Sequence, residues 1–323
     1  MSQASLPPAI APSPQSLSHL HPRNGAGWMV TATGVALLLL GGWLASLESP
    51  WSWVAGQIIV ALALLQWFVI LHEAGHNTLF RTRRLNRLVG HIAGVFALIP
   101  FHNWQRIHAR HHKYTGWQDL DATTALLVPR AVKPWERRVM NLAWATGLPL
   151  FSVLYRMQNF WNLPRVERYL ARPEDVRAVR WNALVLGLIY VVVATAAGPV
   201  TLLATFGLGL ILSLMAQDVI LLSQHTHMPT NLSQGAAVRP FTPQEQEPYT
   251  RSLRLPAWLS LLLLRFDLHE LHHMYVQVPG YDLHRIQYTT QNEVNWLDWT
   301  RDAKRLSGTD FLFGNREQTG FRR

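Results

Sequence analysis

The chain of 323 residues is 49% hydrophobic and only 15% charged, whereas soluble domains carry about 25% charged residues. It contains no Cys, which excludes a disulfide-stapled fold, an iron–sulfur protein and a thiolate zinc site. Its net charge of +10 fits both a nucleic-acid-binding protein and a membrane protein, so the positions of the charges must decide.

The first 27 residues are rich in Pro, Ser and Ala and lack a basic region ahead of an apolar core. This composition is not that of a cleaved signal peptide, and it predicts a disordered cytoplasmic tail over residues 1–27. Residues 28–323 show no internal repeat and no second soluble segment, so they are predicted to form a single membrane domain.

Four long apolar runs predict membrane spans. A helix of about 20 residues crosses the ~30 Å hydrocarbon core, and the third run, which is shorter, is expected to extend into Val179–Asn182. The links Glu48–Pro50 and Gly198–Pro199 permit only tight turns, so the runs predict two helical hairpins. The runs are Trp28–Leu47, Trp51–Leu71, Ala183–Ala197 and Val200–Leu222.

All 29 Lys and Arg residues lie outside these runs and their links. By the positive-inside rule, both termini and the polar segments 72–182 and 223–323 are predicted to be cytoplasmic, where the two segments form a helical cap. The basic excess therefore indicates topology and contact with anionic lipid rather than nucleic-acid binding. The predicted fold is an all-α, multi-pass integral membrane protein, in the inner membrane if the source is bacterial.

Three shorter apolar stretches, Leu88–Phe101, Val139–Tyr155 and Pro256–Leu264, are interrupted or too short to span. They are typical of helices that lie in the membrane interface. If Val139–Tyr155 were instead a true span, the third histidine window described below would lie on the opposite side of the membrane from the other two.

Eight of the 15 histidines fall in three five-residue windows. On a helix, positions i, i+3 and i+4 share one face, so each window presents two or three imidazoles in one direction. The pattern H-x-x-H-H occurs twice, far more often than chance predicts at this histidine frequency. The windows contain His72 and His76; His108, His111 and His112; and His269, His272 and His273.

Eight imidazoles exceed the three or four ligands of a tetrahedral zinc site and suit two metal ions with five or six ligands each. Imidazole suits Fe, Cu, Zn and Ni alike, so the ligand type does not name the metal. All three windows and the segment after the fourth run lie on the cytoplasmic side in this topology, and His225 is the predicted ninth ligand, with His227 as the alternative.

Acidic residues near the windows are predicted to accept the second N–H of ligating imidazoles and so fix the ring orientation. The candidates are Glu73, Asp119, Asp121, Asp267 and Glu270. Asp218, near the end of the fourth run, is a further candidate, with a buried hydrogen bond between helices as the alternative role.

The windows resemble the membrane fatty acid desaturase family, whose pattern is H-x(3,4)-H followed by two copies of H-x-x-H-H. Gln224-His225-Thr226-His227 and Asp119-Leu120-Asp121 are also similar to that family. The resemblance implies an O₂-dependent enzyme with two non-haem iron ions that removes two hydrogens from an acyl chain. A family Asn that holds a metal-bound water is replaced here by Leu221 or Ser223, so that role does not carry over.

A metal centre at the membrane face suits a substrate with a polar head and an apolar tail, such as a fatty acid, an acyl thioester or an acyl lipid. Trp104, Trp117 and Phe266 are candidates to line the tail's groove. No haem, flavin or Cys-cluster motif is recognisable, so an external electron donor of the ferredoxin, rubredoxin or cytochrome type is predicted. The basic residues Arg106, Arg110 and Lys113 are candidates to meet an anionic head.

Other functions remain open at this stage. The first window also fits H-E-x-x-H of zinc proteases, with Glu73 as general base, and histidine-rich loops also occur in metal transport. On the same scaffold, the outcome could be hydroxylation, ketolation, acetylenic-bond formation or oxidative decarboxylation to a terminal alkene, since a shift of about 1 Å in the acyl chain selects between them.

Overall fold

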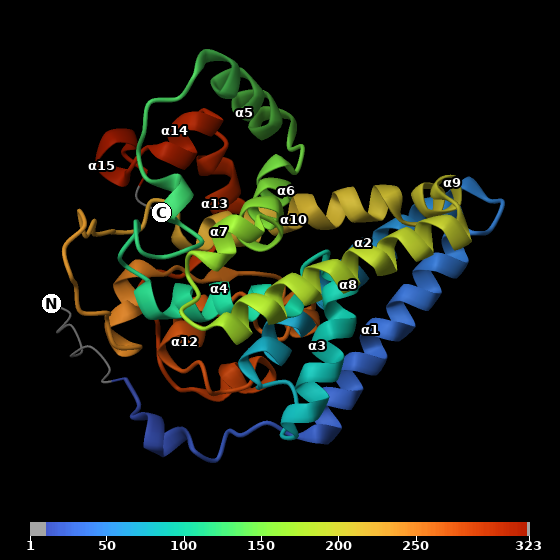
Figure 1. Cartoon of the computed structure of the whole chain (residues 1–323), viewed down its shortest axis with the longest axis horizontal. Helices are drawn as coiled ribbons and strands as arrows, with labels where there is room; N and C mark the ends of the chain where they lie inside the picture. The colour runs from blue at the N-terminus through green and yellow to red at the C-terminus, as the bar shows by residue number, and fades with distance from the viewer. Residues whose placement is uncertain (1–10, 322–323) are drawn as a thin grey trace, which may run out of the picture.

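The computed structural model of the chain describes residues 11–321, and helices dominate this range (Figure 1). The helices are α1 (Asn24–Ala45), α2 (Pro50–His76), α3 (Arg83–Ala97), α4 (Phe101–Tyr114), α5 (Pro134–Thr146), α6 (Leu150–Arg156), α7 (Leu163–Glu167), α8 (Pro173–Ala197), α9 (Pro199–Leu202), α10 (Leu208–His225), α11 (Ala257–Leu262), α12 (His269–Met274), α13 (Trp296–Ala303), α14 (Gly308–Phe313) and α15 (Arg316–Thr319).

Short elements connect these helices. Strands β1 (Leu253–Arg254) and β2 (Val294–Asn295) form a parallel pair. Two segments are π-helical, η3 (Met157–Trp161) and η4 (Leu203–Gly207). The 3₁₀ segments are η1 (Pro14–Leu17), η2 (Ala125–Leu127), η5 (Gln244–Tyr249) and η6 (Gly280–Arg285).

Four helical stretches are long and apolar enough to cross a membrane, and they coincide with the four predicted runs. They are α1, α2, α8 and the continuous stretch Pro199–His225, which contains α9, η4 and α10. The third is longer than its apolar run because α8 begins at Pro173, with Pro at its first position and acidic residues in its first turn. The second continues past its run to His76, so the first histidine window forms its last turns.

The α1–α2 pair is closely packed. A Cβ at Gly56 would lie 2.5 Å from the backbone nitrogen of Ala45, so only Gly permits this approach. α10 packs beside α2. Gln57 of α2 forms hydrogen bonds with the backbone around η4: its Nε2 donates to Thr205 O (2.9 Å), and its Oε1 accepts from Gly209 N (2.7 Å). These bonds satisfy backbone groups that the π-helical turn frees.

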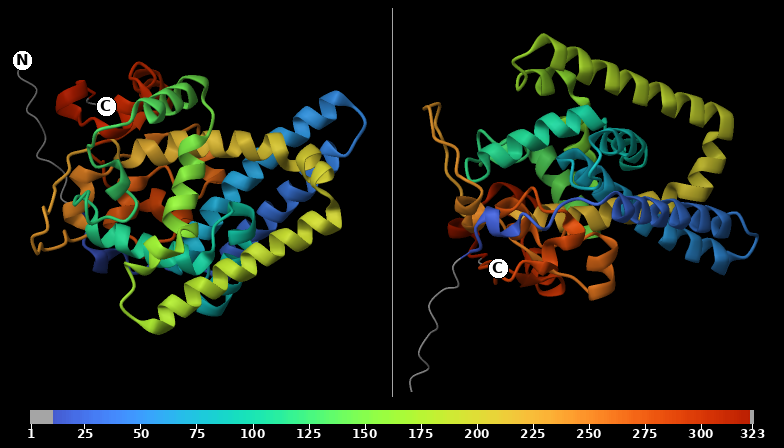
Figure 2. Two further views of the ribbon diagram at one scale, coloured as in Figure 1. Left: turned by 45° about the horizontal axis from the view of Figure 1, so that its top comes forward. Right: turned by 90° about the horizontal axis from the view of Figure 1, so that it is seen from below.

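The second predicted hairpin is joined at its tip but does not close like the first. α8 packs on α4 and α7, whereas α10 packs on α2 and α6, and the two helices run apart in both views of Figure 2. Large apolar side chains of α8 remain exposed on several faces, including Trp181 (64%) and Val192 (63%). Such surface is unfavourable in water and suits a lipid environment.

The three shorter apolar stretches form α3, α5 with α6, and α11, none of which has the length of a span. The Val139–Tyr155 stretch breaks at Gly147, which has a φ of +75°, and Pro149 follows. α3 packs alongside α2, and α5 packs on α14 and α6 (Figure 1); both expose apolar residues such as Leu88 and Leu142.

Residues 11–27 differ from the predicted disordered tail, whose residues 1–10 lie outside the described range. Leu17 and Leu20 are buried in a cluster that includes Leu271 of the third histidine window. Arg23 donates to both carboxylate oxygens of Asp282 (3.0 Å each), and α1 begins at the next residue. The composition of this segment gives it little local preference, but long-range contacts order it.

Arg156 is a buried cation that joins three segments of the cap and bundle. Its Nε donates to Ala97 O (2.9 Å), its Nη1 to Ser152 O (3.0 Å) and its Nη2 to Gln217 Oε1 (2.5 Å). The side chain therefore ties the end of α3 to α6 and α10, and its removal would leave buried acceptors unpaired.

We expect Arg156→Leu to lose about 3 kcal/mol of stability because these acceptors would remain buried without a donor. The thermal midpoint of the detergent-solubilised protein, followed by Trp fluorescence, would fall. The control is Arg180→Ala, which removes an ion pair with Glu167 whose Arg side chain is 61% exposed. An equal fall in both variants would contradict the prediction.

Candidate metal centre

The three histidine windows lie on three helices whose ends meet in the cap. α2 carries the first, α4 the second and α12 the third. The last residue of α10, His225, joins them. In each window the i, i+3 and i+4 spacing places the rings on one helix face, so four elements far apart in sequence converge.

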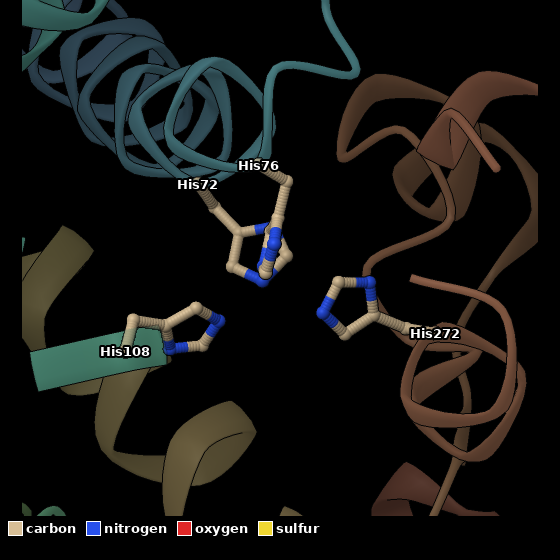
Figure 3. A group of neighbouring side chains, drawn as sticks. All are labelled: His72, His76, His108 and His272. Atoms are coloured by element: carbon tan, nitrogen blue, oxygen red, sulfur yellow. The ribbon is translucent and has the colours of Figure 1, made fainter. Parts of the chain in front are cut away.

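The first group of rings contains His72, His76, His108 and His272. One nitrogen from each lies within 4.8 Å of one from every other member. Figure 3 shows these rings pointing toward one another from α2, α4 and α12. Three are buried and His76 is partly buried.

The second group contains His111, His225, His269 and His273, again with one nitrogen each within 4.8 Å of the others. The Nε2 atoms of His225 and His269 are 2.9 Å apart. His227 does not join this group: it has a φ of +57°, and its ring lies against Phe311 and Phe321. Of the two candidates for a ninth ligand, the structure therefore brings His225 to the centre.

His112 lies beside the first group and touches the second. Its Nε2 is 3.1 Å from the Nε2 atoms of both His108 and His272, and its ring stacks on His273 with centroids 4.3 Å apart. The nine predicted ligands thus come together as sets of five and four, compared with the predicted five or six each.

The arrangement fits a pair of metal ions. Two nitrogens bound to one ion at about 2.1 Å and about 90° to each other are about 3.0 Å apart, close to the 2.9–3.1 Å between neighbouring rings here. The Nε2 atoms of His72, His76 and His273 are buried and have no hydrogen-bond partner in the part of the chain that the structure describes. Buried polar atoms are rarely left in this state unless a ligand satisfies them.

Burial also sets the protonation state of the rings. It lowers the pKa of His108, His112 and His272 well below the usual value, and repulsion from neighbouring imidazoles lowers it further. The pKa values of His269 and His273 fall for the same reasons. These five rings are therefore neutral, which is the form that binds a metal ion.

Two of the five predicted carboxylates contact imidazoles. Asp121 Oδ2 lies 2.7 Å from His111 Nδ1, and Glu73 Oε1 lies 3.2 Å from His72 Nδ1. The other Glu73 oxygen accepts from Gly280 N (2.8 Å) on the segment that follows α12. Glu73 therefore links the first and third windows.

The other three carboxylates differ from the prediction, because their hydrogen bonds go to serine and backbone groups rather than to imidazoles. Ser233 Oγ donates to Asp119 (2.6 Å), Ser260 Oγ to Asp267 (2.6 Å) and Asn292 N to Glu270 (2.8 Å). Glu270 follows His269 directly on α12, and one residue turns the helix by about 100°, which directs its side chain away from the ring face. Asp218 accepts from Ser152 N, the alternative role predicted for it.

Segment η5 supplies two ring contacts that the sequence analysis missed. Gln246 Oε1 lies 2.9 Å from His273 Nδ1, and Tyr249 O lies 3.2 Å from His225 Nδ1. Gln246 also donates to His112 O (2.7 Å) and so connects the second window to the third. No sequence signal marks these residues, since one is an isolated amide and the other acts through its backbone.

An enclosed space beside the imidazoles, which we call the inner hollow, reaches both groups. Its walls include His72 and His111, together with the apolar residues Phe68, Trp104 and Phe266. Of the predicted groove residues, Trp104 and Phe266 line this hollow, whereas Trp117 stacks on Phe241. The inner hollow can hold an apolar chain next to the metal centre.

The alternatives to a two-metal oxidase fit the structure less well. Glu73 is 3% exposed and its oxygens are occupied by His72, Thr78 and Gly280, so it is not free to act as the general base of a protease. The imidazoles also lie at the ends of α2 and α10 rather than near mid-span, where transporters bind ions.

The sequence model of the fatty acid desaturase family matches residues 48–302, which include all three histidine windows. An sn-1 oleoyl-lipid 12-desaturase of Anabaena variabilis is 29% identical over 87% of this chain and 80% of its own length. A second sn-1 oleoyl-lipid 12-desaturase, from a Picosynechococcus species, is 24% identical over 76% and 70%. A chloroplastic sn-2 acyl-lipid omega-3 desaturase (ferredoxin) of Helianthus annuus is 24% identical over 88% and 63%.

We expect Asp121→Asn to weaken metal binding by about 10- to 100-fold, because the His111 ring would lose the charged acceptor that orients it. Retention of iron against a chelator measures this effect. The matched control is Asp119→Asn, since the Asp119 carboxylate contacts Ser233 and no imidazole. Equal retention of iron in Asp121→Asn and the unaltered chain would show that this contact does not orient a ligand.

Proposed function

Since this chain belongs to the fatty acid desaturase family and is therefore an oxidoreductase, we propose that it is a diiron enzyme that uses O₂ to introduce a C=C bond into the acyl chain of a lipid. The predicted resemblance to the family is thereby confirmed. One observation supports the finer assignment: two groups of imidazoles, most of them buried, border an apolar hollow.

His72, His76, His108, His112 and His272 are proposed to hold one iron ion, and His111, His225, His269 and His273 the other. The chemistry that such a pair supplies when bound is the activation of O₂ for hydrogen removal from an unactivated methylene group, which side chains alone do not achieve. The set of five includes His112, which also stacks on His273 of the set of four. The two ions would therefore have different numbers of imidazole ligands.

The protein's own contribution is to orient the rings and to exclude water. Asp121 and Glu73 accept hydrogen bonds from Nδ1–H of His111 and His72, which leaves each Nε2 lone pair free to bind metal. Gln246 and Tyr249 do the same for His273 and His225 without adding charge. Phe68, Trp104 and Phe266 keep the space beside the rings apolar.

The substrate is proposed to be an acyl lipid or a related fatty acyl compound. Two of the relatives described above are named for oleoyl lipids and the third for acyl lipids. A polar head at the interface and a tail beside the imidazoles match the position of the inner hollow at the cap ends of α2 and α10. Hydroxylation and the other same-scaffold outcomes have no separate observation in their favour.

The proposed topology follows from the charge distribution and the four spans. Both termini and the cap lie on the cytoplasmic side, because the Lys and Arg residues are confined to those segments. In a bacterial source the membrane is the inner membrane.

Expression of the chain in an aerobic host, followed by profiling of lipids and hydrocarbons, tests the function. We expect new unsaturated acyl chains, about two iron ions per purified chain, and loss of the product in His111→Ala. Hydroxylated acids or volatile alkenes would select another outcome on the same scaffold. One zinc ion per chain with an unchanged lipid profile would contradict the proposal.

An external reductant is the second expectation. Removal of two hydrogens gives O₂ two electrons, and its reduction to two waters requires two more, which no cofactor motif in this chain supplies. Purified, iron-loaded protein supplied with O₂ should therefore catalyse more than one turnover only after reduced ferredoxin, rubredoxin or a cytochrome is added. Sustained turnover without any added reductant would refute the need for a donor.

A further inference from the structure

We propose that the acyl chain of a bilayer glycerolipid reaches the metal centre sideways, through an apolar passage between α5–α6 and α14. This inference rests on the proposed function and adds the route of access and the physical state of the substrate. It follows from hollows that share walls between the imidazoles and the membrane-facing surface of the cap.

The inner hollow continues into a second one, the middle hollow. Leu127, Phe151, Tyr155 and Leu222 line both, so their side chains separate or join the two spaces. The middle hollow has a volume of about 550 Å³. A chain that filled both would extend from the imidazoles to the outside of the cap.

Helices α5, α6 and α14 form most of the middle hollow, and its lining is apolar for most of its length. Met140 comes from α5, Leu154 from α6 and Leu312 from α14. A shallow groove over the α5–α6 bend, lined by residues such as Leu142 and Val153, shares Val139 and Leu150 with the middle hollow. The three spaces are therefore adjacent, each sharing walls with the next, from the metal centre to the outer face of α5.

The rim of the path is suited to lipid rather than to water. Trp135 is 62% exposed, Val139 47% and Leu142 63%, and all three belong to α5, which packs on α14 and α6 (Figure 1). Exposed apolar residues at that depth are covered by acyl chains in a bilayer. A lipid tail can enter here without first leaving the membrane.

A polar group also stands at the mouth. Arg130 pairs with Glu136 (3.0 Å), lies over the ring of Phe313 (4.9 Å) and keeps 44% of its side chain exposed. An Arg at the interface can meet the phosphate or ester oxygens of a glycerolipid while the tail occupies the path. The mouth thus combines a cation for the polar head of a glycerolipid with apolar residues for its tail.

A third hollow, the polar arm, leaves the inner hollow in another direction. Thr124, Leu127, His225 and Thr226 line both spaces. Its further walls include polar residues such as Gln118, Thr230 and Asn315. The reaction yields two waters, and this arm suits their release better than it suits an acyl chain. Leu127 lines the inner hollow, the middle hollow and the polar arm, and so stands at the fork.

Photo-crosslinking of the full chain in lipid nanodiscs tests the route without requiring turnover. The probe is a phosphatidylcholine with a diazirine near the end of one acyl chain. We expect crosslinks on residues 123–127 and 150–158, and their loss in Leu127→Trp, which fills the fork. The control is Leu184→Trp, on the exposed face of α8, which should leave the crosslinks unchanged.

A second variant covers the case in which Leu127→Trp does not fold. Because the chain has no Cys, Leu154→Cys in the middle hollow and Leu184→Cys on α8 each provide one reactive thiol. A bulky maleimide should abolish crosslinking inside the path in the first variant and leave it intact in the second. Iron content reports the folding of every variant.

Crosslinks confined to α1 and α8, or found only on residues 228–230 and 314–315 of the polar arm, would overturn the proposed route. So would lipid desaturation that persists after Leu154→Cys is blocked. The two proposals fail separately: desaturation without crosslinks in the path refutes the route alone. Crosslinks in the path without any oxidised lipid refute the desaturase assignment and leave the route.

Discussion

The rest of the structure depends on the burial of imidazoles whose ring nitrogens face one another. His72, His269 and His273 are each no more than 2% exposed, and the Nε2 atoms of His72 and His273 have no hydrogen-bond partner within residues 11–321. A buried polar atom without a partner costs about 1–3 kcal/mol. Metal binding at these atoms would offset this cost, so the feature that destabilises the chain by itself also marks the proposed metal site.

The surrounding residues make this arrangement rigid. Glu73 joins α2 to the segment after α12, Gln246 joins α4 to α12, and Asp121 holds a ring of α4. The rings are therefore fixed by the same contacts that hold the cap together. Such a centre requires the helices that carry its rings to end close to one another. α2 ends at His76 and α10 ends at His225, so both contribute rings from their last turns.

Sequence reasoning selected the histidines that converge but not all of the residues that contact their rings. The nine predicted histidines converge because their windows follow or flank the apolar runs, and spacing by three and four residues is a local property of a helix. The carboxylates were harder to assign. Asp119, Asp267 and Glu270 are as near in sequence to the windows as Asp121 is, yet their hydrogen bonds go to Ser233, Ser260 and Asn292.

The chain's sequence by itself determined the four apolar helices, the shorter apolar stretches that do not reach the length of a span, and the nine histidines that converge, because apolar length and helical period are properties of neighbouring residues. Only the tertiary structure decided the order of residues 11–23, the divergence of α8 from α10, the supporting roles of Gln246 and Tyr249, and the fork at Leu127. Each of these depends on contacts between segments distant in sequence, whose energies no local pattern contains.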